Sequence, residues 1–293
     1  MTDEHQGWAG EDAAARAWDV FGDSFDLPGI VGAEPRQFAG RTFRAWDVVP
    51  NHVTFPQQTG DCVAVSSCDV LDMMAQIEIA MGDAEEFHRL YPPFLYATSR
   101  VLIGQNRLKG RGGSVGSWMA KALETYGALR ADVAGVPVYS GRTADDWGDG
   151  KGDWRRWLPD AAPHTVSVTF LDNWEQLVEH ICRGYLCTMA SSLGFNETPD
   201  NKGFHRQSGT WNHSMGIWGI SDDARNPWVG IHNNWGSRGP RIVDFETGEM
   251  WPEGMLRVRP DDIQRAFTHG EIIAYANFNG FADRPTPEAI WET

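Results

Sequence analysis

A cysteine, a histidine and an asparagine stand where their side chains could carry out nucleophilic catalysis. Cys62 follows a glycine turn in QQTGDC and opens a long apolar run. His213 opens a β-type run in WNHSMGIWGI, and Asn233 follows another such run in IHNNWGS. In this chemistry a thiolate attacks, an imidazole pairs with it and moves the proton, and a third group orients the imidazole. Cysteine alone decides nothing, because free cysteine is usually a small buried hydrophobe.

The expected position of Cys62 favours a reactive thiol. We expect it in the first turn of a helix, where unpaired N–H groups and the positive end of the helix dipole stabilise a thiolate and lower the pKa. Asp61 directly precedes it, and a neighbouring carboxylate raises the thiol pKa and so opposes the helix end.

The context of His213 sets it apart from the other eight histidines of the chain. It lies about 150 residues after Cys62, a separation that suits a cysteine on a helix of one lobe and a histidine in a second lobe. Two neighbouring strands would place His213 beside Asn233, whose amide oxygen would accept from the ring N–H. Trp235 would shield that hydrogen bond from water.

The elements that must position these residues fall into two halves. Apolar residues nearly surround a helix predicted over 62–81, so we expect it to be buried on most faces, with Gly82 as its stop. The first half is mainly helical: further helices are expected over 11–21, 92–102 and 115–126, the last ended by Gly127.

The second half is mainly sheet. A segment rich in Trp, Asp and Gly over 143–163 comes first. Short β-type runs then follow in HTVSVTF, YLCTMA, MGIWGI and WVGIHN, with one helix over 173–183. This is an α+β arrangement, and a cleft between two such lobes is a common place for an active site. We divide the chain into an N-terminal extension (1–40, with a loop after its helix), a helical lobe (41–160), a β lobe (161–280) and a tail (281–293).

Composition excludes several classes of protein. The 293 residues carry a formal charge of −15, which argues against nucleic acid or an anionic membrane surface as a partner. We see no signal peptide and no apolar run long enough for a spanning helix, so we expect a cytoplasmic or virion-associated protein. Four cysteines are too few for a disulfide scaffold, and without a Cys/His cluster no metal is predicted.

Taken together and in order, the motifs resemble those of the papain-like cysteine peptidases, of the shorter bacterial or phage type. The resemblance covers about residues 41–280. Its anchors are QQTGDCVAV, YPPFLYATSRV, GRGGSVGSWMAKALETYG, WNHSMGIWGI and IHNNWGS. It implies a two-lobed fold, with an N-terminal helical lobe, a C-terminal antiparallel β-barrel-like lobe and the active site in the cleft between them.

The resemblance also assigns roles to residues. Cys62 is implied as the nucleophile, His213 as the general acid/base and Asn233 as the orienting residue. The Gly112–Gly113 loop would bind an extended polypeptide substrate through its backbone, with Trp235 beside it. The implied reaction is cleavage of a peptide or isopeptide bond through an acyl-enzyme on Cys62, without a cofactor.

The oxyanion glutamine departs from the family pattern. The family places it six residues before the nucleophile, where this chain has Pro56; Gln57 lies five before and Gln58 four before. We prefer Gln57. Such a donor stabilises the developing negative charge, and its loss costs about 10²–10³ in rate, so this departure bears on activity.

Two rival functions remain. One is an inactive papain-type domain kept as a structural or binding component, such as a phage virion protein, whose N-terminal extension and tail contact other subunits. The other transfers the acyl group to an amine, as transglutaminases do, and Asn-x-Trp-Gly argues against it. We also expect the extension to be too short to cross the cleft as well as fold, so that no maturation cleavage is needed.

Overall fold

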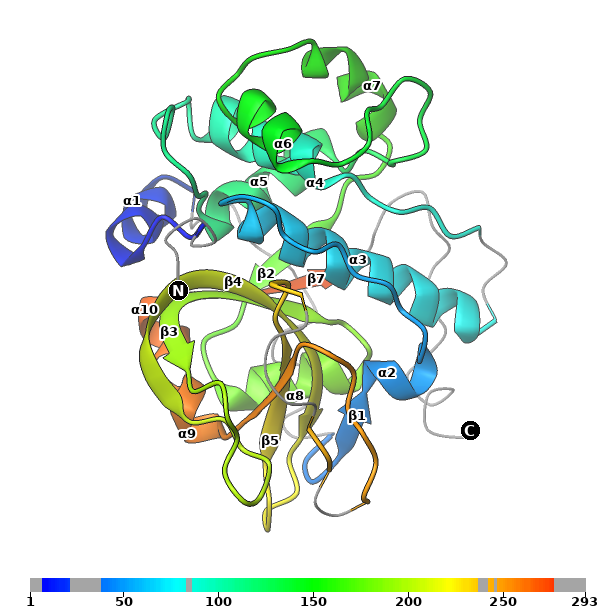
Figure 1. Ribbon diagram of the computed structural model, residues 1–293, viewed down its shortest axis with the longest axis vertical. Coiled ribbons are helices and arrows are strands. Elements are labelled where there is room, and N and C mark those ends of the chain that lie inside the picture. The colour runs from blue at the N-terminus through cyan, green and yellow to red at the C-terminus, as the bar shows by residue number, and fades with distance from the viewer. Residues whose placement is uncertain (1–6, 22–37, 83–85, 237–241, 245–246, 277–293) are drawn as a thin grey trace.

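The protein consists of a mainly helical half and a sheet half, with the helix α3 running between them (Figure 1). The structure is a computed structural model that describes residues 7–21, 38–82, 86–236, 242–244 and 247–276. The predicted loop over 22–37 and the tail over 281–293 lie outside these ranges. The boundaries that we drew between extension, lobes and tail stay predictions.

The helices predicted over 11–21, 62–81, 115–126 and 173–183 are present, and the structure has further short helices that the sequence pattern does not predict. The helices of the described residues are α1 (Glu11–Phe21), α2 (Ala45–Val48), α3 (Cys62–Ala80), α4 (Pro92–Ala97) and the π-helix η3 (Thr98–Ile103), then α5 (Gly116–Tyr126), α6 (Gly141–Gly148), the 3₁₀-helix η4 (Trp154–Trp157) and α7 (Leu158–Ala161), then α8 (Trp174–Cys182), α9 (Pro260–Ile263) and α10 (Ala266–His269). The helix predicted over 92–102 is thus α-helical only in its first part. Three short helices, α6, η4 and α7, occupy the segment over 143–163.

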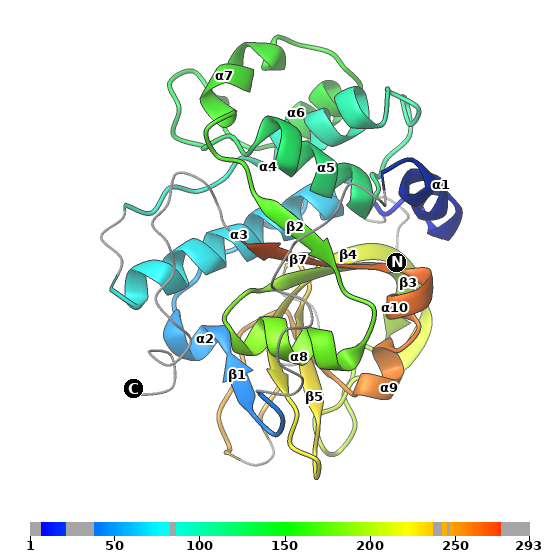
Figure 2. The ribbon, with the colours of Figure 1, turned by 180° about the vertical axis from the view of Figure 1, so that it is seen from behind.

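One antiparallel sheet forms the second half. Its strands are β2 (Ser167–Phe170), β3 (Cys187–Phe195), β4 (Gln207–Ser221), β5 (Trp228–His232), β6 (Met255–Val258) and β7 (Glu271–Ala276), in the order β2-β7-β3-β4-β5-β6. A short strand, β1 (Thr42–Arg44), pairs with β4. The sheet is open at β2 and β6, so the lobe is barrel-like without being a closed barrel. From behind, the chain passes from the helical half into the sheet at β2 (Figure 2).

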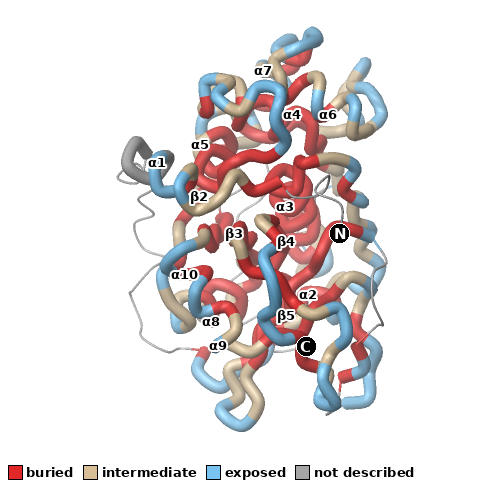
Figure 3. The backbone as a smooth tube through the Cα atoms, turned by 60° about the vertical axis from the view of Figure 1, so that its left-hand side comes forward, coloured by how far each residue is buried: buried red, intermediate tan, exposed pale blue. Residues whose placement is uncertain are grey.

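The central helix α3 is buried along most of its length, as its apolar pattern predicts (Figure 3). It packs against β4 and β3 on one side and against α4 and α5 on the other. Met81 caps its C-terminus and Gly82 follows with a positive φ of 107°, a conformation that glycine adopts without strain. A helix so enclosed holds its first residue, Cys62, in a fixed place between the two halves.

Within the described part of the chain, no helix combines the length and the apolar character needed to cross a lipid bilayer.

Candidate active site

Cys62 is the first residue of α3, as predicted. The carbonyl of Asp61 accepts from the backbone N–H of Ala64 (2.9 Å) and of Val65 (3.0 Å), so the first turn of the helix closes directly behind the thiol. The side chain of Asp61 is fully buried and accepts a hydrogen bond from the Tyr139 hydroxyl at 2.9 Å. Burial is the main reason that its pKa rises to about 7.

His213 lies in the middle of β4, and Asn233, which directly follows the neighbouring strand β5, lies beside it. His213 Nε2 is 3.0 Å from Asn233 Oδ1, with the amide oxygen as the acceptor. The indole of Trp235 stacks on the imidazole, with 4.3 Å between ring centroids and 27° between planes. The ring of His213 is fully buried, so this stacking covers the hydrogen bond as we expected.

Two contacts bring the thiol to the histidine strand. Ser66, one helical turn after Cys62, shares a hydrogen bond of 2.8 Å with the hydroxyl of Ser214. The backbone N–H of Ser214 also donates to the Cys62 thiol. Since Ser214 directly follows His213, these contacts pack the first turns of α3 against β4 next to His213.

The thiol of Cys62 is in a different state from the one that its helix end predicts. Burial, which penalises the charged form, raises its pKa to about 12, and the charge of Asp61 adds to the increase. Hydrogen bonds from backbone groups of Ser214, Gly7 and Val63 lower the pKa by less than burial raises it. The expectation of a lowered thiol pKa is therefore wrong for this conformation.

The thiol is buried because the N-terminal segment lies on it. A Cβ atom built on Gly7 would stand 2.8 Å from Cys62 Sγ and would also clash with the Gly60 carbonyl. On one side of the segment, the carbonyl of Asn212 accepts from the N–H groups of Gly7 (3.2 Å) and Trp8 (3.0 Å). Only glycine at position 7 allows this close approach.

The other side of the segment pairs with the predicted substrate loop. Ser114 donates its N–H to the Gly7 carbonyl at 2.7 Å and accepts from the N–H of Ala9 at 2.8 Å, in a parallel bridge. Gly113 has a positive φ of 96°, and a Cβ there would lie 2.9 Å from the Gly7 oxygen. Gly112 lies against Gly60 and makes no backbone hydrogen bond to the described residues 7–10. The ladder bonds thus come from Ser114, which follows the two glycines that we predicted.

Trp8 anchors the segment in the body of the protein. Its side chain is 4% exposed, and its indole N–H donates to Glu271 Oε2 at 2.8 Å. The carboxylate of Glu271 also accepts from the backbone N–H of Gly116 (2.8 Å) and of Ser117 (2.7 Å), the first residues of α5. The expectation that the extension is too short to cross the cleft is wrong, because residues 7–9 lie across it.

The two candidate oxyanion glutamines point in different directions. Gln57 is 5% exposed, its N–H donates to the Asn234 carbonyl at 2.9 Å, and its side-chain amide donates to the carbonyl of Thr59. Gln58 is exposed, and its side chain accepts from the N–H of Gly141 at 3.2 Å. The burial of Gln57 favours it over Gln58, and its oxyanion role stays a prediction.

The three other cysteines, Cys68, Cys182 and Cys187, have free thiols and are fully buried. Sequence reasoning missed Trp8 and Glu271, because a lone tryptophan in a short polar segment and a lone glutamate at the start of a strand carry no pattern. The close approach of Gly7 left no signal in the sequence either.

Solved structures of similar architecture are cysteine proteases. Xylellain, a cysteine protease from Xylella fastidiosa, is 13% identical, with a TM-score of 0.61 over 95% of this chain and 98% of that one. ProCathepsin B S9 from Trypanosoma congolense is 11% identical, with a TM-score of 0.54 over 87% of this chain and 81% of that one. Digestive procathepsin L 3 of Tenebrio molitor is 13% identical, with a TM-score of 0.53 over 94% and 77%. No family model and no curated protein matches the sequence. With this agreement over nearly the whole chain, the protein has a papain-like fold.

Proposed function

We propose that the protein is a thiol hydrolase that cleaves peptide or isopeptide bonds through an acyl-enzyme on Cys62. The observation that carries this proposal is the imidazole of His213, bonded at 3.0 Å to the amide oxygen of Asn233, on a strand that packs against the helix opened by Cys62. The hydrogen bond between Ser66 and Ser214 joins that helix and that strand beside both residues. The fold shared with cysteine proteases supports the proposal.

The chemistry follows from the arrangement. The His213 ring nitrogen that does not face Asn233 takes the thiol proton, and the sulfur attacks the carbonyl carbon of the substrate. The imidazolium then protonates the departing amine, leaving a thioester. The same nitrogen activates a water molecule that releases the acyl group as a carboxylic acid and restores the thiol. Gln57 is the proposed donor to the oxyanion in both steps.

In the conformation described here the thiol is covered. Gly7 lies against the sulfur, with its N–H bonded to the Asn212 carbonyl and its own carbonyl bonded to the N–H of Ser114. We propose that residues 7–9 leave the cleft before a substrate binds. We expect this opening to need no cleavage of the chain. An intact-mass measurement on active protein tests that prediction.

The test is labelling by a peptidyl epoxide together with hydrolysis of a fluorogenic peptide library. Both would be measured on the full chain and on Gly7→Ala, whose added methyl group pushes the segment off the thiol. We expect a single adduct on Cys62 and hydrolysis in Gly7→Ala, both lost in Cys62→Ser. Cys68→Ser is the matched control, because Cys68 is equally buried on the same helix; it should still be labelled and active.

Each rival function predicts a different outcome. An inert papain-type domain would label all four cysteines slowly and alike, and would hydrolyse nothing even as Gly7→Ala. A transferase would couple a labelled amine to a glutamine donor faster than water releases the acyl group. The asparagine that bonds His213 is the feature of this site that argues against the transferase.

A further inference from the structure

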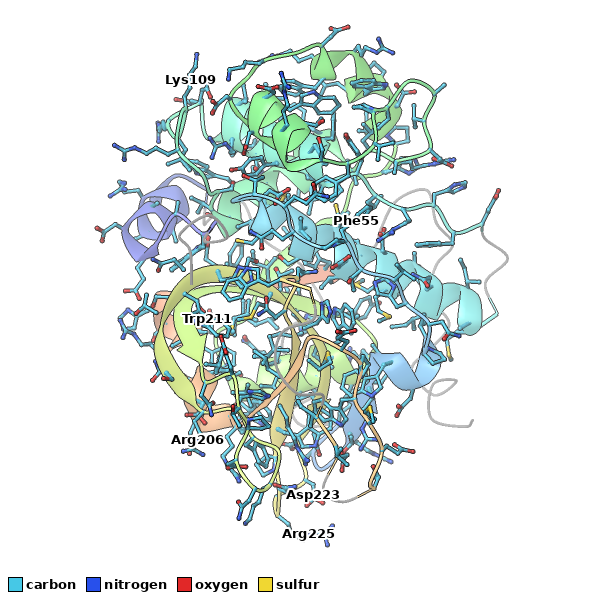
Figure 4. All side chains as sticks on the ribbon, in the orientation of Figure 1. Phe55, Lys109, Arg206, Trp211, Asp223 and Arg225 are labelled. Atoms are coloured by element: carbon cyan, nitrogen blue, oxygen red, sulfur yellow. The ribbon has the colours of Figure 1, made fainter. Side chains whose placement is uncertain are left out.

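A buried carboxylate on α3 is bonded to both loops that frame the site. Asp69, two helical turns after Cys62, is fully buried. Its Oδ1 accepts from the backbone N–H of Phe55 at 3.2 Å, and its Oδ2 accepts from the side-chain amide of Asn234. Figure 4 shows Phe55 next to α3, on the segment that leads to the nucleophile.

The hydrogen bonds of Asp69 connect the two segments that carry Gln57 and Asn233. Phe55 lies two residues before Gln57, whose N–H donates to the carbonyl of Asn234 at 2.9 Å. Asn234 lies between Asn233, which accepts from His213, and the tryptophan that stacks on the same imidazole. The loop of the proposed oxyanion donor and the turn of the orienting amide are therefore tied to each other and, through one carboxylate, to the helix that carries the thiol.

We infer that Asp69 is a positioning residue, which sets the register of Gln57 and Asn233 against Cys62. The inference rests on the proposed thiol hydrolase. Asp69 lies behind the reacting groups and acts through its two hydrogen-bond partners. Carboxylate oxygens suit this task, since both accept hydrogen bonds, whereas an amide side chain offers only one acceptor.

The decisive variants are Asp69→Asn and the double variant Asp69→Asn/Asn234→Asp, called the reversed pair, in which the two side chains are exchanged. In Asp69→Asn the new amide N–H₂ faces the N–H₂ of Asn234, so one of the two loops is released. Adding Asn234→Asp restores a donor and an acceptor with their direction reversed and keeps the net charge of the wild type. Asp72→Asn is the matched control: it lies on the same helix, is 1% exposed, and accepts from the N–H of Leu90 at 3.0 Å. It reaches the Phe55 loop only through Arg89, which lies 3.7 Å from Asp72 and stacks on the Phe55 ring, so it differs from Asp69 in lacking a direct hydrogen bond to that loop.

Turnover should separate positioning from stability. In the Gly7→Ala background we expect Asp69→Asn to lower kcat by about 10²-fold with little change in KM, because a misplacement of about 1 Å costs on this order. The reversed pair should recover at least part of this loss. Asp72→Asn should keep kcat even where it lowers the melting temperature. Equal losses in Asp69→Asn and Asp72→Asn, or no recovery in the reversed pair, would overturn the inference.

A second readout keeps this inference apart from the proposed function. If the Gly7→Ala chain hydrolyses nothing, the hydrolase proposal fails, and amide hydrogen exchange then tests the tie alone. Asp69→Asn should speed the exchange of the Phe55 and Gln57 amides at least tenfold relative to Asp72→Asn, and the reversed pair should slow it again. Unchanged exchange at both amides would show that Asp69 holds neither loop.

Discussion

At the scale of single residues, the contact of Gly7 with the Cys62 sulfur determines the state of the thiol. The segment covers the sulfur, and burial accounts for most of the rise in its pKa to about 12. The helix end and the neighbouring Ser214 N–H are available to stabilise a thiolate only once the sulfur meets water or a substrate. Reactivity therefore depends on how often residues 7–9 leave.

Replacing the anchor of that segment should expose the thiol. We predict that Trp8→Ala raises the rate of Cys62 alkylation at pH 7 by about 10²-fold, because truncating a buried tryptophan costs about 3–5 kcal/mol and shifts the balance toward the open form. The same variant should bring the alkylation midpoint to a lower pH, since an uncovered thiol has a lower pKa than a buried one. The measurement is mass-resolved alkylation by iodoacetamide across pH 6–10.

The control for this experiment is Asp12→Ala. Asp12 is an exposed residue of α1, four positions after Trp8. Its removal should leave the labelling rate and midpoint as they are. If Trp8→Ala left both unchanged too, the segment would not be what protects the thiol.

At the scale of elements, the π-helix η3 carries a side chain that fixes the substrate loop. Arg100, 2% exposed, donates to the carbonyls of Leu108 (2.8 Å), Arg111 (2.7 Å), Gly113 and Gly148 (2.9 Å). A guanidinium has five N–H donors in a fixed planar fork, so it can hold this loop where a more flexible cation cannot.

We predict that Arg100→Lys loosens the loop and weakens substrate binding more than chemistry. Lysine has three donors and cannot reproduce the fork, so several buried carbonyls lose their partner, at about 1–3 kcal/mol each. Peptide hydrolysis in the Gly7→Ala background should show KM raised about tenfold or more with kcat changed less. Arg107→Lys in the same loop is the control and should change neither value. A fall in kcat alone would contradict a role in holding the loop.

The sequence predicts the long elements of the fold better than the short ones. The apolar pattern of α3 and the β-type runs of β3 to β5 are strong because many residues share one environment. Strand β7 is buried on both faces and shows no alternation, and α6 and α7 are only 8 and 4 residues long, too short for a periodic pattern to stand out. These were missed for lack of a pattern.

The candidate site likewise contains residues that the sequence predicts and contacts that it does not. Cys62, His213 and Asn233 could be predicted because catalysis needs particular residue types at element ends. The contacts of Gly7, Trp8 and Ser114 could not, since they are backbone pairings and packing between distant parts of the chain that no local pattern encodes.

At the scale of the whole molecule, two histidines, buried His232 and half-buried His52, make stability depend on pH. His232 is 4% exposed and stacks on Trp218, with 3.9 Å between centroids and 7° between planes. Burial lowers its pKa to about 3, with the charge of His52 as a smaller cause. Burial likewise lowers the pKa of His52 to about 4, helped by Arg89.

The sign of the effect follows from linkage. The folded pKa of His232 lies below the unfolded value of about 6.5, so its contribution to stability is fully present above pH 6.5 and is lost as the pH falls toward 3. Asp61 and Asp72, whose pKa values burial raises to about 7, act in the opposite direction, because the folded chain takes up their protons first on acidification. The variant must therefore be compared with the wild type at each pH.

We predict that His232→Gln loses less stability on acidification than the wild type. Between pH 6 and 4 the difference in unfolding free energy should change by up to about 1.4 kcal/mol per pH unit, because glutamine binds no proton in either state. Urea unfolding at half-unit steps of pH measures this. His269→Gln, at an exposed position of α10, should run parallel to the wild type. A His232→Gln curve parallel to the wild type as well would contradict the assignment.

The tether of residues 7–9 has a kinetic consequence. An occupant carried on the same chain is present at an effective concentration on the order of millimolar, whatever the dilution of the protein. A free peptide at micromolar concentration cannot compete with it by mass action, so the first turnover waits for a unimolecular opening step. Progress curves should then begin with a lag whose length does not change with the amount of enzyme.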